Sequence, residues 1–321
     1  MLYGFLAERG LRPIITKGIM CRRLYPYPDQ RVSVDEDMLI DPKLMPEYHR
    51  AMLERGFELV EPDCSVESDH EIAYSHPDSH LYIEIHKTFF PPDSSAYGSC
   101  NAVLEGAPER CEEIVIEGVP MLTPAPTDHL LYLILHAYKH FLHGGVGIRQ
   151  TADICMFAEH YADRIDRARI ESACNELHIS KFVGALFRIG ERRLGFNGFG
   201  LFESIDVDES PLLSDILSGG LYGAKDVNRL HSSTLTLEAV AADRAGKKRK
   251  GALHSVFLPA KALSGRYRYL KKAPWLLPAA WTQRIWNYAV KRDKDAVRPS
   301  ESLKIGRERI ELLKTYDIIE R

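Results

Sequence analysis

Two hydrophobic patterns follow one another along the chain. Between residues 12 and 118, short β-branched or apolar runs such as VSVDEDMLI and HLYIEIHKTF predict strands, the second with alternating apolar and polar positions. A helical repeat predicts a helix over residues 41–56, with Asp41 as its N-cap, Pro42 at its first position and Gly56 at its end. The short gaps between the predicted strands favour a mixed or antiparallel sheet over a doubly wound parallel one.

The pattern becomes helical from residue 123. The run TPAPTDHLLYLILHAYKHFLHGG predicts a long helix with a broad apolar stripe, which begins near Thr127 and ends at Gly144 and Gly145. Further helical spacing continues to about residue 240, and SLKIGRERIELLKTY predicts a last helix. The sequence therefore predicts an α+β fold in three parts: a sheet domain with flanking helices (1–120), a helical domain (121–240) and a basic helical segment (241–321).

The composition is that of an ordinary soluble protein. Of the 321 residues, 45 % are hydrophobic and 27 % are charged, which is enough for a sizeable core. Six cysteines are scattered without a C-x-x-C pair, so neither a zinc site nor a disulfide framework is predicted. The sequence shows no secretory leader and no run of about eighteen apolar residues, which predicts a cytoplasmic protein that does not span a membrane.

Basic residues are concentrated in one segment. The formal net charge is −3, but residues 244–292 contain thirteen Lys or Arg and no Asp or Glu, which leaves 29 basic and 45 acidic residues elsewhere. Aromatic residues are interleaved with the basic ones, a mixture that suits RNA or an anionic membrane surface. The segment is also consistent with packing against the acidic remainder of the chain, so three alternatives stay open.

The stretch RVSVDEDMLID carries the first candidate for chemistry. On a strand, Asp35 and Asp37 lie on one face and Glu36 on the other. Adjacent carboxylates repel each other unless a cation neutralises them, and oxygen ligands on a rigid strand suit Mg²⁺, with Mn²⁺ as an alternative. Glu84, in the apolar strand HLYIEIHK, would supply a third carboxylate. The three acids together predict a site for two ions, about 3.5 to 4 Å apart, that clamps a phosphoryl transfer.

The order of motifs resembles a known family. The run IITKGIMCRRLYPYPDQRVSVDEDMLID is followed by YIEIHKTFF and then by HLLYLILHAYKHFLHGGVGIRQTADI. Over residues 10–160, this ordered set resembles the uncharacterised bacterial nucleotidyltransferases of the DNA-polymerase-β-like superfamily. The resemblance implies a catalytic domain that uses a nucleoside triphosphate and Mg²⁺. It also implies transfer of a nucleoside monophosphate to an acceptor with release of pyrophosphate.

The same resemblance implies roles for single residues. Asp35 and Asp37 would hold the metal ions, and Glu84 would be the third carboxylate, either as a ligand or as the general base for the acceptor. Lys17 and Gly18 stand where the superfamily has the turn that cradles the triphosphate. Lys17 or Arg31 would neutralise phosphate charge.

The sequence departs from the family pattern at three positions. Glu36 replaces an apolar residue that usually faces the core, Glu84 replaces Asp, and Lys87 stands where an aromatic residue is common. A charge on the core side has to reach a partner or solvent, because burying it alone costs about several kcal/mol. The departure at Glu36 therefore keeps open the alternative of a site that has drifted away from catalysis.

Four further residues, the last of them together with an acidic partner in its helix, are candidate neighbours of the site. His86, two residues after the third acid, is predicted to steady that acid. His136 and His140 share one face of the long helix, where the resemblance favours contact with nucleotide or acceptor, although such pairs more often pack or bond to carbonyl groups. Arg149 and Asp153, at i and i+4, are most simply an intrahelical ion pair.

These observations predict a Mg²⁺-dependent nucleotidyltransferase that acts on a nucleoside triphosphate and a small-molecule or protein acceptor. A rival from a different class is a catalytically silent relative that binds nucleotide or a partner protein. A second rival is an RNA- or membrane-binding protein that acts through residues 244–292. No motif specifies the acceptor, the nucleotide base or the oligomeric state.

Overall fold

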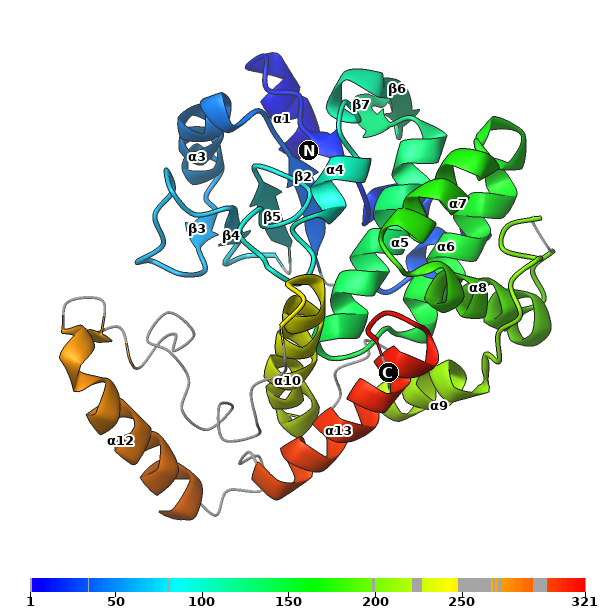
Figure 1. The fold of residues 1–321 in the computed structure, drawn as a ribbon. Helices are drawn as coiled ribbons and strands as arrows, with labels where there is room; N and C mark the ends of the chain where they lie inside the picture. The colour runs from blue at the N-terminus through cyan, green and yellow to red at the C-terminus, as the bar shows by residue number, and fades with distance from the viewer. Residues whose placement is uncertain are drawn as a thin grey trace. The chain divides into compact units, whose positions relative to one another are not determined.

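The computed structural model describes most of the chain, in two compact units. The first unit comprises Met1–Ala137 and Gln150–Ile205, and the second comprises Tyr138–Arg149 and Asp206–Arg321 (Figure 1). The predicted domain boundaries at residues 120 and 240 stay a prediction. The described residues are 2–33, 35–79, 81–197, 200–220, 227–247, 267, 269, 270, 273–290 and 299–320.

A seven-stranded mixed sheet organises the first unit. Its strand order is β3-β4-β5-β2-β1-β7-β6, in which the pairs β2–β5 and β1–β7 are parallel and the other pairs are antiparallel. The predicted mixed sheet and the α+β class are thereby confirmed. The strands are β1 (Ile14–Ile15), β2 (Glu36–Leu39), β3 (Glu58–Leu59), β4 (Glu71–Ser75), β5 (Tyr82–His86), β6 (Cys111–Ile116) and β7 (Val119–Pro124).

The register of β2 and β5 decides which side chains meet. The two strands are parallel, and Asp37 lies directly opposite Glu84. Ile83 and Ile85 are 2 % and 0 % exposed and belong to the hydrophobic core. Because side chains alternate along a strand, Asp37 and Glu84 share the face opposite to that core.

Helices contribute to the hydrophobic core of this sheet. Side chains of α1 (Leu2–Glu8), α2 (Ile19–Arg22) and α3 (Met45–Glu54) pack into one cluster with the apolar face of the strands. Burying a large apolar side chain contributes about 1.5 to 3 kcal/mol, so this cluster gives the sheet a rigid support. Fully buried members include Leu6, Met38, Tyr48, Met52, Ile72 and Ile85.

The segment before α3 has the predicted capping residue, but the helix begins later than predicted. Asp41 accepts a hydrogen bond from the backbone N–H of Lys43 at 3.0 Å, as expected of a capping residue. The cap begins a 3₁₀ turn, Pro42–Leu44, and the α-helix itself starts at the next residue. The restricted conformation of proline at the first position suits both kinds of turn.

The predicted long helix is α5 (Pro126–His143), whose residues up to Ala137 belong to the first unit. His129 fixes it to the sheet, because its Nε2 donates to the carbonyl of Thr16 at 2.6 Å and its Nδ1 lies 3.0 Å from Thr123 Oγ1. The apolar stripe is fully buried at Leu130, Leu131, Ile134 and Leu135. Other helices that lie wholly or partly in this unit are α4 (Cys100–Val103), α6 (Ile148–His160), α7 (Arg167–Glu176) and α8 (Ser180–Ile189).

The second unit is helical in its described part. Gly306 of α13 lets this helix approach α10 closely, since a side chain there would collide with Leu235. Arg229 and Arg309 donate to backbone carbonyls at the C-terminal end of α5, where the helix dipole favours cations. The helices are α9 (Ser210–Gly219), α10 (Val227–Arg244), α12 (Leu277–Val290) and α13 (Pro299–Thr315).

Much of the basic segment 244–292 lies outside the described residues. Of its described part, Trp275 is 75 % exposed. The three alternatives for this segment therefore stay predictions. Among the helices that the structure describes, none combines the length and apolar character needed to cross a membrane.

Candidate functional site

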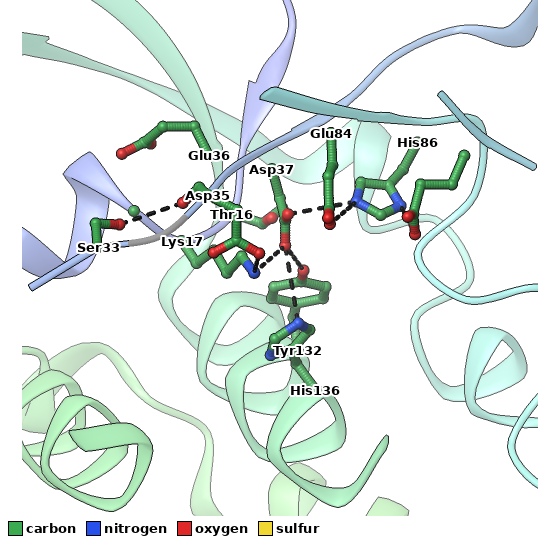
Figure 2. Close-up of polar contacts among 12 residues, drawn as sticks. Thr16, Lys17, Ser33, Asp35, Glu36, Asp37, Glu84, His86, Tyr132 and His136 are labelled. Atoms are coloured by element: carbon green, nitrogen blue, oxygen red, sulfur yellow. Dashed lines mark hydrogen bonds and ion pairs between the residues drawn. The ribbon is translucent and has the colours of Figure 1, made fainter. Parts of the chain in front are cut away.

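Two neighbouring strands and the residue before one of them bring three acids together. Asp37 on β2 and Glu84 on β5 lie side by side, and Asp35 precedes β2 by one residue. Figure 2 shows the carboxylates of Asp35, Asp37 and Glu84 on the side of the strands that faces Tyr132 and His136 of α5. Asp37 is only 1 % exposed, so its charge has to be balanced by neighbouring side chains.

Lys17 supplies a positive charge between two of these acids. Its Nζ lies 2.7 Å from Asp35 Oδ2 and 3.1 Å from Asp37 Oδ2. Burial lowers the pKa of Lys17, but the charges of Asp37 and Asp35 outweigh this effect and raise it above its usual value. Lys17 reaches the acids because it follows β1, the antiparallel neighbour of β2. The ammonium group thus occupies the space where two carboxylates would otherwise repel each other.

His86 lies on the other side of Asp37. Its Nε2 is 3.4 Å from Asp37 Oδ1 and 3.7 Å from Glu84 Oε2, and its Nδ1 is 3.5 Å from Glu71 Oε2. Burial lowers the pKa of His86, but the facing Asp37, with Glu84 and Glu71, raises it to about 9. Burial raises the pKa of Asp37 in turn, while Lys17 and His86 hold it well below its usual range.

Asp37, Glu84 and His86 together fit a divalent metal ion. One ligand atom each from Asp37, Glu84 and His86 lies within 4.8 Å of the others. Asp37 Oδ1 and both ring nitrogens of His86 are buried without a hydrogen-bond partner. Native proteins rarely leave such atoms unsatisfied, so these atoms have capacity for a ligand. Two carboxylate oxygens and an imidazole nitrogen form a donor set that divalent metals bind.

Helix α5 adds two side chains that face Asp37. The hydroxyl of Tyr132 donates to Asp37 Oδ2 at 2.9 Å, and His136 Nε2 lies 3.8 Å from the same oxygen. His136 was predicted to lie near the site and does so, whereas Tyr132 was not predicted. Its signal in the sequence is a tyrosine in a buried helical stripe, one turn before His136, because a buried tyrosine hydroxyl needs a polar partner.

Glu36 finds a partner at the first residue of α2. Its Oε2 accepts a hydrogen bond from the backbone N–H of Ile19 at 3.0 Å. Gly18 has a φ of 61°, and a side chain there would collide with the Glu36 carboxylate. Burial raises the pKa of Glu36 to about 7, although the bond from Ile19 opposes the shift. Figure 2 shows this side chain pointing away from Asp37, so it fixes the turn that carries Lys17.

Arg31 is held by an acid on α6. Its Nε and one terminal nitrogen donate to the two carboxylate oxygens of Asp153 at 2.9 and 2.8 Å, and Tyr25 donates to the same acid at 2.8 Å. The remaining terminal nitrogen donates to the carbonyl of Gly18 at 3.2 Å. Arg31 therefore supports the Gly18 turn from a position that is 4 % exposed. Its predicted role at a phosphate stays a prediction.

A family model described as "uncharacterised nucleotidyltransferase" matches residues 1–195, which is more than half of the chain and contains every residue of the site. The chain belongs to this nucleotidyltransferase family. The resemblance drawn from the motifs is thereby confirmed, and the protein is a transferase of the nucleotidyl class with a nucleotide substrate.

Two solved structures are similar to this nucleotidyltransferase over almost its whole length. They are "Structure of tRNA-processing enzyme complex 3", with 13 % identity over 98 % of this chain and 99 % of that one, and "tRNA-processing enzyme (apo form I)", with 14 % identity over 100 % and 96 %. Both have a TM-score of 0.26, which is below the level that indicates a shared fold. The curated proteins contain no match to the sequence.

Within the nucleotidyltransferase, most of the predicted site residues meet. Three of them contact Asp37, namely Lys17, His86 and His136, and Lys17 and His86 also contact Asp35 and Glu84, respectively. The adjoining turn is shaped by Gly18, Arg31 and Glu36. His140 and Arg149 belong to the second compact unit, and their predicted roles stay predictions.

Proposed function

We propose that this protein transfers a nucleoside monophosphate from a nucleoside triphosphate to a hydroxyl or amino group of a small molecule or protein. In this reaction the acceptor atom bonds to the α-phosphorus, and the bond from that phosphorus to the β-phosphate oxygen breaks. Pyrophosphate leaves, and the acceptor proton passes to a base. The family supports the reaction class, and the chemistry of the site supports the division of roles below.

The carboxylates of Asp37 and Glu84 would hold the metal, and Asp35, which now pairs with Lys17, is the third candidate ligand. When bound, Mg²⁺ or a similar ion would neutralise phosphate charge and stabilise the attacking and leaving oxygens. A carboxylate oxygen of Glu84 that does not bind the ion would accept the acceptor proton. In the metal-free site, burial raises the pKa of Glu84.

Lys17 and its turn would receive the triphosphate. The ammonium group is the cation next to Asp35, and Gly18, with a φ of 61° and no side chain, allows the turn to pack closely against the Glu36 carboxylate. Glu36 and Arg31 hold the two ends of this turn through the Ile19 N–H and the Gly18 carbonyl. A fixed turn lowers the entropic cost of orienting the phosphates for attack.

One observation carries the proposal: in a chain of a nucleotidyltransferase family, Asp37 lies in register with Glu84 and keeps one buried oxygen without a hydrogen-bond partner. The test incubates the full-length protein with each α-labelled nucleoside triphosphate, Mg²⁺ or Mn²⁺, and a cell extract as the source of acceptors. Label transfer and pyrophosphate release are measured for the natural protein, for Asp37→Asn, and for Asp41→Asn as the matched control.

We expect transfer by the natural protein and by Asp41→Asn, because asparagine caps a helix as well as aspartate does. Asp37→Asn should lose a factor of about 10² to 10³ in rate, as when one charge-stabilising group is removed from an active site. Nucleotide binding without pyrophosphate release, equal in Asp37→Asn, would instead identify a catalytically silent relative. Lys17 and His86 favour that rival, because they already neutralise Asp37.

A further inference from the structure

The two oxygens of Asp37 are used in different ways. Oδ2 accepts from Tyr132 at 2.9 Å and lies 3.1 Å from the ammonium of Lys17. Oδ1 has no hydrogen-bond partner and faces only the imidazole of His86 at 3.4 Å. The Lys17 ammonium therefore serves one oxygen of the carboxylate, and the imidazole of His86 faces the other oxygen, which has no hydrogen-bond partner.

His86 is aimed into the space beside that free oxygen. It is 7 % exposed, and neither of its nitrogens has a hydrogen-bond partner. Its Nε2 lies 3.4 Å from Asp37 Oδ1 and 3.7 Å from Glu84 Oε2. Two ligand atoms that each lie about 2.1 Å from one ion are about 3 to 3.5 Å apart, so the observed separations suit atoms that share an ion.

Glu71 faces the second ring nitrogen of His86. It lies opposite His86 in the antiparallel pair β4–β5, and its Oε2 is 3.5 Å from His86 Nδ1. Histidines that bind metals usually give their other N–H to a carboxylate, which fixes the ring and strengthens the metal bond. Glu71 is in position to act in this way on the nitrogen that faces away from Asp37.

We infer that Asp37, Glu84 and His86 form a mixed oxygen and nitrogen site for one first-row transition ion such as Mn²⁺, and that the Lys17 ammonium takes the place of a second ion between Asp35 and Asp37. The role of this ion in nucleotidyl transfer rests on the proposed function. An imidazole ligand favours transition ions over Mg²⁺, which prefers oxygen. The site then holds one ion rather than the two that the sequence predicts.

The test uses Mn²⁺ as the probe and the full-length protein. Binding is followed by the loss of the free Mn²⁺ electron paramagnetic resonance signal, and pulsed measurements detect coupling between the bound ion and a ¹⁴N nucleus. We expect about one Mn²⁺ per chain with ¹⁴N coupling, which excess Mg²⁺ displaces poorly. His86→Asn should remove the coupling and weaken binding by at least about tenfold. His136→Asn is the control and should retain the coupling.

Two further variants separate the parts of the inference. Lys17→Met should bind a second Mn²⁺, because Asp35 and Asp37 Oδ2 then lack their ammonium partner. Glu71→Gln should keep the coupling and bind Mn²⁺ more weakly. Thermal unfolding without metal verifies that each variant is folded.

Several outcomes would overturn the inference. They are no bound Mn²⁺, two bound ions in the natural protein, absence of ¹⁴N coupling, or coupling that disappears in His136→Asn. Label transfer with Mg²⁺ and without nitrogen coupling would retain the proposed function and reject this metal site. Bound Mn²⁺ with ¹⁴N coupling but without label transfer would retain this metal site and reject the proposed function.

Discussion

Asp37 and Asp128 are both 1 % exposed and both belong to the first compact unit, yet their carboxylates are satisfied in different ways. Asp128, in the first turn of α5, accepts two hydrogen bonds from Arg110 at 2.8 and 3.0 Å and a further bond from Arg169. Asp37 accepts from Tyr132 and contacts Lys17 through one oxygen, while its other oxygen has no hydrogen-bond partner.

Neither burial nor charge separates these two aspartates. Burial raises the pKa of each, and cationic neighbours lower it below the usual range: Lys17 and His86 at Asp37, and Arg110 and Arg169 at Asp128. The difference lies in the lone pairs. The arginines saturate both oxygens of Asp128, whereas Asp37 keeps one oxygen for a ligand. The unsatisfied atom therefore identifies the candidate metal ligand.

The largest expected difference between the two aspartates is in stability. Asp128→Asn should lower the free energy of unfolding by about 2 kcal/mol, because it removes charge-assisted bonds from two arginines that can return to solvent only in part. Asp37→Asn should lower it by a smaller amount, because Lys17 and His86 lose a charged partner but relief of the repulsion with Asp35 and Glu84 offsets part of that loss.

Urea unfolding of both variants without metal measures these differences. Because the two changes are chemically identical, each variant is the matched control of the other. An equal loss in Asp37→Asn would show that this residue is a structural ion-pair partner, and would remove the contrast with Asp128.

The sequence was sufficient to predict the mixed sheet, whereas the roles of the central acids stay predictions. The β-branched and apolar residues of VSVDEDMLI and the alternation along HLYIEIHKTF indicated two strands, and the structure pairs Asp37 with Glu84 in parallel neighbouring strands. The α1 helix and the order of the strands were not predicted, because strand order depends on long-range pairing that no local pattern encodes. The last predicted helix, SLKIGRERIELLKTY, corresponds to α13 and was recognisable from its helical spacing alone.

The environment of the acids was harder to predict than the acids themselves. Lys17 was expected at phosphate, and the structure pairs it with Asp35 and Asp37. Its position follows from the pairing of β1 with β2, which the sequence does not state. Glu36 lacked a role in the sequence because its partner is a backbone N–H, which carries no residue-specific signal.

The pH dependence of the free energy of unfolding offers a narrower test of the Asp128 carboxylate, whose two oxygens are both hydrogen-bonded. The pKa of Asp128 is lower in the folded protein than in the unfolded chain, where it is about 3.9. As the pH falls below about 4, the unfolded chain takes up the proton first, so Asp128 contributes stability above this pH and loses it below. The stability gap between the natural protein and Asp128→Asn should therefore narrow in acid.

Unfolding free energies of both proteins from pH 6 to pH 3 measure this gap. Other carboxylates titrate in the same range, but they are common to both proteins and cancel in the difference. A gap that stays constant or widens below pH 4 would mean that the bonds from Arg110 and Arg169 do not depend on the charge of Asp128.

The smallest effect is expected at Glu36, a third kind of acid, whose partner is a backbone group. Glu36→Gln keeps an oxygen that can accept from the Ile19 N–H, so the free energy of unfolding should change by less than about 0.5 kcal/mol. Glu36→Leu introduces an apolar side chain and removes the acceptor, and should cost about 1 kcal/mol. Urea unfolding compares the two variants, and nucleotide affinity shows whether the turn has moved. Equal losses in both would mean that the charge of Glu36, rather than its hydrogen bond, holds the turn that carries Lys17.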